Sequence, residues 1–168
     1  VLADHPTASL ALVQPDGSVE EAAAGLHFPN GSVITPDGGT LIVGETLSAS
    51  LTAFTIAADG RLSDRRLWAV TMTDPAAPRV PDGICLDAEG AVWIANPAAS
   101  ECVRIAEGGA VLQVVETLQP CFACMLGGPD RRTLFMMTAP TSDNDIVARA
   151  SLGRIEIVEV AVPGAGRP

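Results

Sequence analysis

Two dipeptides that join an oxygen-bearing side chain to a glycine are the strongest candidates for chemistry in this chain. Asn30-Gly31 lies within "HFPNGSVITPDGGTLIVGE" (residues 27–45), and Asp82-Gly83 lies within "VPDGICLDAEGAVWIAN" (residues 80–96). Amide and carboxylate oxygens are the hard ligands that Ca²⁺ or Mg²⁺ prefers, and a carboxylate beside a cation can also act as a base. Asn-Gly and Asp-Gly are also ordinary turn formers. From the residues alone, a metal site and a pair of turns both remain open.

Further residues near these dipeptides are weaker candidates for a substrate pocket. His27 precedes "FPNG", although a lone histidine beside a strand more often has a surface or packing role. Cys121 and Phe122 begin a later apolar run and could line a substrate entrance, with core packing as the alternative. Glu45 and Asn96 end equivalent runs, and this repetition favours a structural role over a pocket role.

The cysteines do not form a recognisable metal motif. The "CFAC" spacing of Cys121 and Cys124 matches a metal or redox pair, but no second pair and no histidine cluster completes a four-ligand site. A chain of 168 residues is also too long to depend on disulfides for its stability. We therefore expect all four cysteines, which include Cys85 and Cys102, to be small apolar residues of buried strands.

Composition and charge exclude two classes of partner. Hydrophobic residues make up 48% of the chain and charged residues 18%, which is typical of a globular protein. The net charge of −10 opposes binding to nucleic acid or to an anionic membrane surface, and no apolar run reaches the length of a membrane span. The first residues, "VLADHPTASL", lack the basic start and apolar core of a signal peptide, so a cytoplasmic location is expected.

The pattern of hydrophobic runs predicts an all-β fold. Each run is short and ends at a turn signal, and no segment has a helical period over eleven or more residues. For example, Asp37-Gly38 between "GSVIT" and "LIVGE" predicts a hairpin. Trp68 and Trp93 fall within strand-like runs and are expected to fill the space between sheets.

The sequence also repeats itself at the spacing of propeller blades. Asn30-Gly31 aligns with Asp82-Gly83 at an offset of 52, and "TLIVGE" aligns with "AVWIAN" and "TLFMMT" at offsets of 51 and 93. Repeats of about 40 to 50 residues with four strands each are typical of β-propellers. We predict one truncated propeller domain over residues 1–168. Its approximate blades are 27–75, 76–118 and 119–168, and residues 1–26 form the outer strands of a preceding blade.

In a propeller the first strand of each blade lines a central channel, so equivalent residues at the start of those strands converge. This geometry predicts that the side chains of Asn30 and Asp82 meet at the axis. The same alignment places Ala123 at the third equivalent position, where it offers no ligand.

Several motifs together resemble one family. "FPNG", "TPDGGTLIVGE", "AADGRLSDRR", "PDGICLDAEGAVWIA" and "LGGPDRRTLF" look like the senescence marker protein / gluconolactonase / luciferin-regenerating family, also called regucalcin-like. The resemblance implies a six-bladed propeller that hydrolyses sugar lactones and holds one divalent cation through a Glu, an Asn and an Asp. Asn30 matches the Asn ligand. Asp82 matches the Asp, which the family is thought to use as both ligand and base.

The match covers only the C-terminal half of the family pattern. The Glu ligand and half of the substrate pocket belong to the family's first half, so about three blades of four antiparallel strands are expected here. For the cation, Ca²⁺ is the first choice, and Mg²⁺, Mn²⁺ and Zn²⁺ are also compatible with one amide and one carboxylate.

Two functions follow from the resemblance. The first is cation-dependent hydrolysis of a small lactone, by this chain or by an enzyme of which it is the C-terminal half. The alternative is a non-catalytic propeller module that binds a cation or a partner. Three blades would leave two apolar flanks open, which self-association or the remainder of a longer protein would cover.

Overall fold

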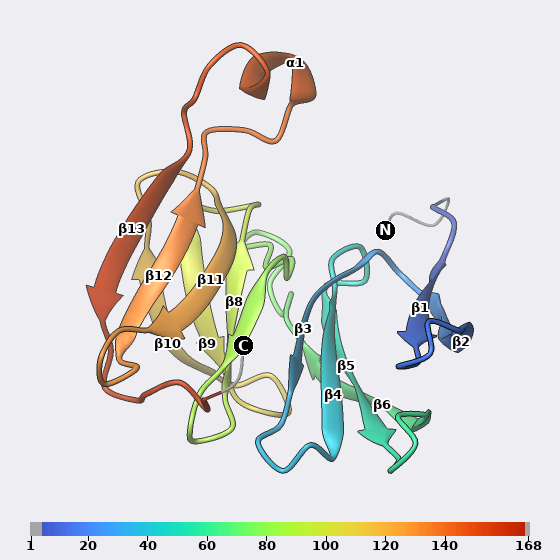
Figure 1. Cartoon of the computed structure of the whole chain (residues 1–168). Helices are drawn as coiled ribbons and strands as arrows, with labels where there is room; N and C mark the ends of the chain where they lie inside the picture. Colours follow the sequence, from blue (N-terminus) through green and yellow to red (C-terminus); the bar gives the residue numbers. More distant parts are fainter. Residues whose placement is uncertain (1–4, 167–168) are drawn as a thin grey trace.

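Antiparallel strands make up most of the computed structural model, which describes residues 5–166 (Figure 1). The one helix in this range, α1 (Asn144–Val147), has four residues and lies in a long loop that projects from one end of the molecule. No helix within residues 5–166 has the length and apolar character needed to cross a lipid bilayer.

The strands form up-and-down sheets that follow one another along the chain. The β1–β2 hairpin comes first, with strands Ala8–Val13 and Val19–Leu26. A first sheet of order β3–β4–β5–β6 comprises Pro29–Ile34, Thr40–Glu45, Ser50–Ile56 and Leu62–Val70. A second sheet of order β7–β8–β9–β10 comprises Ile84–Leu86, Val92–Asn96, Glu101–Ile105 and Val111–Glu116. A third sheet of order β11–β12–β13 comprises Cys121–Gly127, Thr133–Thr138 and Arg154–Glu159.

The third sheet has three strands within the described residues, where the repeat predicted four. After β13 the chain leaves this sheet and runs across to the end of β7. Gly164 forms a β-bridge with Asp87, and the N–H of Ala165 donates a hydrogen bond of 3.0 Å to the carbonyl of Leu86. The C-terminal segment therefore joins the third sheet to the second and leaves β13 as an open edge.

Several hairpins use one type of turn, in which a carboxylate and a glycine act together. In the β3–β4 turn, Asp37 Oδ1 accepts a hydrogen bond of 3.0 Å from the N–H of Gly39, and Gly38 adopts a φ of 76°. Asp16 and Asp59 accept equivalent bonds from the residues two positions later in their own turns. A positive φ is readily adopted by glycine, and Asp bonds its own turn backbone. The hairpin predicted at Asp37-Gly38 is confirmed.

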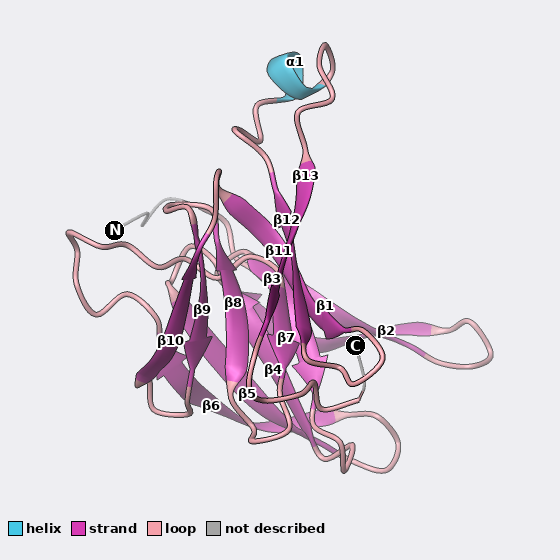
Figure 2. Ribbon diagram, turned by 90° about the vertical axis from the view of Figure 1, so that its left-hand side faces the viewer, coloured by secondary structure: helices cyan, strands magenta, loops and turns pink. Residues whose placement is uncertain are grey.

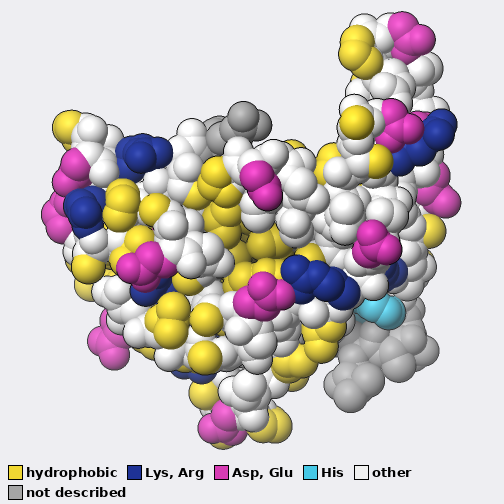
Figure 3. Space-filling view, turned by 90° about the horizontal axis from the view of Figure 1, so that it is seen from below, with side chains coloured by type: hydrophobic (Ala, Val, Ile, Leu, Met, Phe, Trp, Pro, Cys, Tyr) yellow, Lys and Arg dark blue, Asp and Glu magenta, His cyan; other side chains and the backbone are white. Residues whose placement is uncertain are grey.

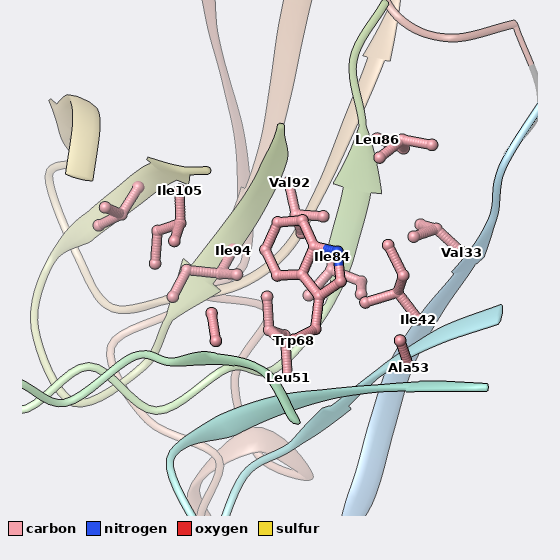
Figure 4. Close-up of a cluster of buried hydrophobic side chains, with 12 residues drawn as sticks. Val33, Ile42, Leu51, Ala53, Trp68, Ile84, Leu86, Val92, Ile94 and Ile105 are labelled. Atoms are coloured by element: carbon pink, nitrogen blue, oxygen red, sulfur yellow. The ribbon is translucent and has the colours of Figure 1, made fainter. Parts of the chain in front are cut away.

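The hydrophobic core lies in layers between successive sheets. Trp68 is buried between the first and second sheets among residues of both, which include Leu51, Ile84 and Ile94 (Figure 4). Trp93 is buried in a second layer, between the second and third sheets. This layer also contains all four cysteines, which are free thiols, so the predicted burial of the cysteines and both tryptophans is confirmed.

The arrangement is a partial β-propeller. The first strands β3, β7 and β11 lie next to one another, and the later strands of each sheet lead outward (Figure 2). Both flanks of this arc expose apolar surface. Ile155 and Ile157 on β13 are 70% and 64% exposed, and an apolar groove separates the β1–β2 hairpin from β3 and β4. Seen from below, hydrophobic side chains gather in the hollowed middle of the molecule (Figure 3).

Candidate functional site

The first strands of the three sheets are bonded to one another at the end where Asn30 and Asp82 lie. The N–H of Gly31 donates a hydrogen bond of 3.0 Å to the carbonyl of Asp82. In the same way, the N–H of Gly83 donates a hydrogen bond of 2.9 Å to the carbonyl of Phe122. Asn30, Asp82 and Phe122 therefore occupy equivalent places at this end of the three sheets.

The third of these places was predicted to hold Ala123, and this prediction was wrong by one residue. The β3–β4 pairing shifts register between Pro29 and Ser32, and the β11–β12 pairing shifts between Cys121 and Ala123. Such a bulge inserts an extra residue and redirects its side chain. In β11 the extra residue is Phe122, which therefore corresponds to Asn30.

Neither candidate dipeptide forms a turn. Asn30 and Gly31 lie inside β3, and the N–H of Asp82 donates a hydrogen bond of 3.1 Å to the carbonyl of Ala95 on β8. Neither glycine has a positive φ. A Cβ atom on Gly31 would lie 2.5 Å from the carbonyl oxygen of Asp82, and a Cβ on Gly83 would lie 2.7 Å from the Cα of Ala123. These glycines are therefore required because the backbones of adjacent sheets approach closely.

Asp82 is a half-buried carboxylate beside the Asn30 amide. Burial raises the pKa of the Asp82 carboxyl, and a hydrogen bond from the Asn30 side chain opposes this effect only in part. No arginine or histidine within residues 5–166 forms an ion pair with this carboxylate. Its negative charge is therefore poorly stabilised by the protein, and a bound cation would stabilise it.

Thr46 connects the two candidate ligands and was not identified from the sequence. Its hydroxyl donates a hydrogen bond of 2.7 Å to the carbonyl of Pro81, next to Asp82. The same hydroxyl oxygen lies 3.5 Å from Asn30 Nδ2. Thr46 thus links the Asn30 side chain to the loop that presents Asp82. The only available signal was its position directly after Glu45.

A polar side chain at the end of a second strand holds the loop that precedes each of these ligands. Glu45 is 2% exposed, and its Oε2 accepts a hydrogen bond of 2.6 Å from the N–H of His27. Asn96 is fully buried, and it accepts a hydrogen bond of 3.2 Å from the N–H of Val80 and donates one of 2.9 Å to the carbonyl of Pro78. These contacts give Glu45 and Asn96 the structural role that their repetition indicated.

Replacing Asn96 with alanine is expected to lower the free energy of unfolding by about 2 kcal/mol, because buried polar groups of the 78–82 loop lose their partner. Urea unfolding measures this change. Gln113→Ala, at an exposed position on β10, is the control and should change stability by less than about 0.5 kcal/mol. Equal stability of the two variants would show that Asn96 does not hold the loop.

The other three candidate pocket residues lie in different surroundings. His27 is exposed and borders a hollow with Glu45 and Arg65, and Asp82 does not line this hollow. Cys121 is fully buried in the core layer between the second and third sheets. Phe122 is half-buried and borders a hollow of about 230 Å³ at the rim of the third sheet. Of these three, the structure brings only Phe122 next to the Asp82 loop.

Asn30 and Asp82 suit a hard divalent cation by their chemistry. The Asn30 amide supplies an oxygen and Asp82 a carboxylate, and no ion pair competes for that charge within the described range. Within residues 5–166, no three His, Cys, Asp or Glu side chains are grouped so that they could hold a metal. Ca²⁺ takes six to eight oxygen ligands, so these two residues would be part of its coordination shell.

Comparison with known proteins identifies the family. Residues 2–140 match the model of the SMP-30/Gluconolactonase/LRE-like region, and the chain belongs to this family. Regucalcin from Xenopus laevis is 31% identical over 134 residues, which cover 78% of this chain and 44% of regucalcin. Regucalcin from Danio rerio is 30% identical over 81% of this chain and 46% of its own length. The chain thus spans less than half of the curated relatives that it matches.

Solved structures of similar proteins have the same fold. A gluconolactonase from Xanthomonas campestris matches with a TM-score of 0.64 and 31% identity over 79% of this chain and 42% of its own. A calcium-binding regucalcin from Agrobacterium tumefaciens has a TM-score of 0.75 and 21% identity over 95% of this chain and 55% of its own. A luciferin-regenerating enzyme has a TM-score of 0.78 and 20% identity, covering 93% of this chain and 53% of that enzyme.

Proposed function

We propose that this chain acts in the divalent-cation-dependent hydrolysis of a sugar lactone or a similar cyclic ester. It does so either by itself or as the C-terminal half of a longer enzyme. The proposal rests on the meeting of Asn30, on β3, and Asp82, in the loop just before β7. Membership of the family supports it, because a gluconolactonase is among the similar proteins. Phe122 is proposed to form the wall of the substrate pocket nearest to these ligands.

Ca²⁺ is the proposed cation. Asn30 and Asp82 supply only oxygen atoms, and a similar protein is described as calcium-binding. Mg²⁺, Mn²⁺ and Zn²⁺ accept the same donors and are the alternatives to compare in the assay. Asn30 Nδ2 lies 3.5 Å from Thr46 Oγ1, so the amide oxygen is the atom suited to a cation.

The residues of this chain have distinct roles in the proposed reaction. When bound, a divalent cation polarises the lactone carbonyl and lowers the pKa of a bound water. In this proposal Asp82 accepts a proton from the attacking water and returns it to the ring oxygen as the acyl–oxygen bond breaks, which gives the hydroxy acid. Asn30 is neutral, so it leaves the positive charge of the site available to the substrate. Thr46 and Asn96 hold the loop that carries Asp82, and Glu45 holds the backbone that precedes Asn30.

The proposal is tested by following acid release from glucono-δ-lactone. We expect turnover with Ca²⁺, loss of turnover after chelation with EDTA, and recovery when Ca²⁺ is restored. The control contains Ca²⁺ without protein, because lactones also hydrolyse spontaneously. If no divalent cation supports turnover above this control for any lactone tried, the hydrolase proposal is wrong for this chain.

A non-catalytic cation-binding module is the second candidate. Two observations favour it. The chain covers only 44% of Xenopus laevis regucalcin, and within residues 5–166 no group of three acidic, histidine or cysteine side chains could hold a metal. Stoichiometric binding of Ca²⁺ by isothermal titration calorimetry, without turnover of any lactone, is the expected result for this function.

Self-association is proposed to cover the apolar flanks. Inside the chain, apolar sheet faces pack against neighbouring sheets, whereas Ile155 and Ile157 on β13 are exposed and the β1–β2 hairpin leaves an apolar groove against the first sheet, among the described residues. A second copy offers a sheet face of the same kind. Light scattering should then give the mass of at least a dimer, and a stable monomer would contradict this.

A further inference from the structure

The end of the sheets at which Asn30 and Asp82 lie changes from polar to apolar between the first and third sheets. Asn30 lies beside Thr46 in the first sheet. In the third sheet the same two places are occupied by Phe122 and Ala139, because Pro29 pairs with Glu45 as Cys121 pairs with Thr138. A polar pair in one sheet is thus replaced by an apolar pair in the other.

Phe122 borders a hollow that continues this apolar surface. Its other lining residues are Met137, Thr138, Ala139, Thr141 and Ser142, from the end of β12 and the loop that follows it. The hollow measures about 230 Å³. It lies at the same end of the sheets as Asp82, because the N–H of Gly83 is bonded to the carbonyl of Phe122.

We propose that the preferred substrate is a cyclic ester with an alkyl substituent, which packs against Phe122 while the ring lies at Asn30 and Asp82. This inference rests on the function proposed above and narrows its substrate class. A hydroxyl group placed against Phe122 and Ala139 would lose hydrogen bonds to water without finding a partner on those side chains. An alkyl chain loses no hydrogen bonds, and each buried methylene is worth about fourfold in affinity.

The inference is tested by comparing kcat/KM for δ-decanolactone and glucono-δ-lactone, with Ca²⁺ present. The wild-type chain should prefer the alkyl lactone. Phe122→Thr should lower this preference about tenfold, and Phe122→Leu should retain most of it. The matched control is Phe135→Thr, which makes the same change on β12 of the same sheet, outside the hollow, and should leave the preference unchanged.

A binding measurement separates this inference from the proposed hydrolysis. The lactam with the same alkyl chain as δ-decanolactone is titrated by calorimetry and compared with unsubstituted δ-valerolactam. The alkyl lactam should bind more tightly to the wild type and to Phe135→Thr, and Phe122→Thr should lose most of this difference.

The outcomes are distinguishable. If the binding difference depends on Phe122 but no lactone is hydrolysed, the apolar subsite stands and the hydrolase proposal fails. If lactones are hydrolysed with equal or greater preference for the sugar lactone, the inference is overturned and the hydrolase proposal stands. An effect of Phe135→Thr as large as that of Phe122→Thr would also overturn the inference.

Discussion

Replacing Asp82 with asparagine is expected to lower Ca²⁺-dependent lactone turnover by at least about 100-fold, the typical contribution of a positioned acid–base group. The substitution keeps the shape of the side chain and removes its charge and its capacity to accept a proton. Its backbone N–H remains available to bond Ala95, so the loop should keep its position. Initial rates with saturating Ca²⁺ measure the loss.

Cation binding and a control complete the Asp82 experiment. Loss of one anionic ligand should also weaken Ca²⁺ binding in calorimetry by at least about tenfold, equivalent to about 1.4 kcal/mol. Glu116→Gln removes a carboxylate of the same charge from an exposed position on β10 and should leave rate and affinity unchanged. Turnover that survives in Asp82→Asn would remove Asp82 from the mechanism.

Replacing Gly31 with alanine is expected to reduce the free energy of unfolding by about 3 kcal/mol, the upper range for overpacking. The new Cβ would lie 2.5 Å from both the carbonyl oxygen of Asp82 and the backbone N of Ile84. These are backbone atoms, so the first and second sheets must separate. Urea unfolding measures the loss of stability. Calorimetry should show weaker Ca²⁺ binding, since the same movement separates Asn30 from Asp82.

Gly153→Ala is the matched control for Gly31→Ala. The nearest atom to a Cβ on Gly153 is the carbonyl oxygen of Thr138 at 3.7 Å, an ordinary contact, and its φ is not positive. The control should therefore change stability by less than about 0.5 kcal/mol. Similar stability of the two variants would mean that the close approach of β3 to the Asp82 loop does not contribute to the stability of the fold.

Much of the fold could be predicted because its signals are local. The turn at Asp37-Gly38 and the short apolar runs specify hairpins through residues that are neighbours in the sequence. The repeat then predicts that similar sheets stand side by side. The meeting of Asn30 and Asp82 follows from that repeat, because equivalent residues on adjacent inner strands must be neighbours.

The parts that could not be predicted depend on single-residue shifts and on long-range contacts. The bulge in β11 puts Phe122 rather than Ala123 in the place that corresponds to Asn30 and Asp82, and an alignment of apolar runs does not show a bulge. Thr46 bonds the carbonyl of Pro81, 35 positions later in the chain. The bridge between Asp87 and Gly164 likewise depends on how the third sheet packs against the second, so no local sequence motif predicts it.

The central claim is that Asn30 and Asp82 hold one divalent cation together, and a crystal structure of the chain grown with Ca²⁺ tests it most directly. Anomalous scattering should locate one Ca²⁺ within about 2.3–2.6 Å of Asn30 Oδ1 and of an Asp82 carboxylate oxygen. A Ca²⁺ bound elsewhere, with no peak between these two side chains at saturating concentration, would contradict the account.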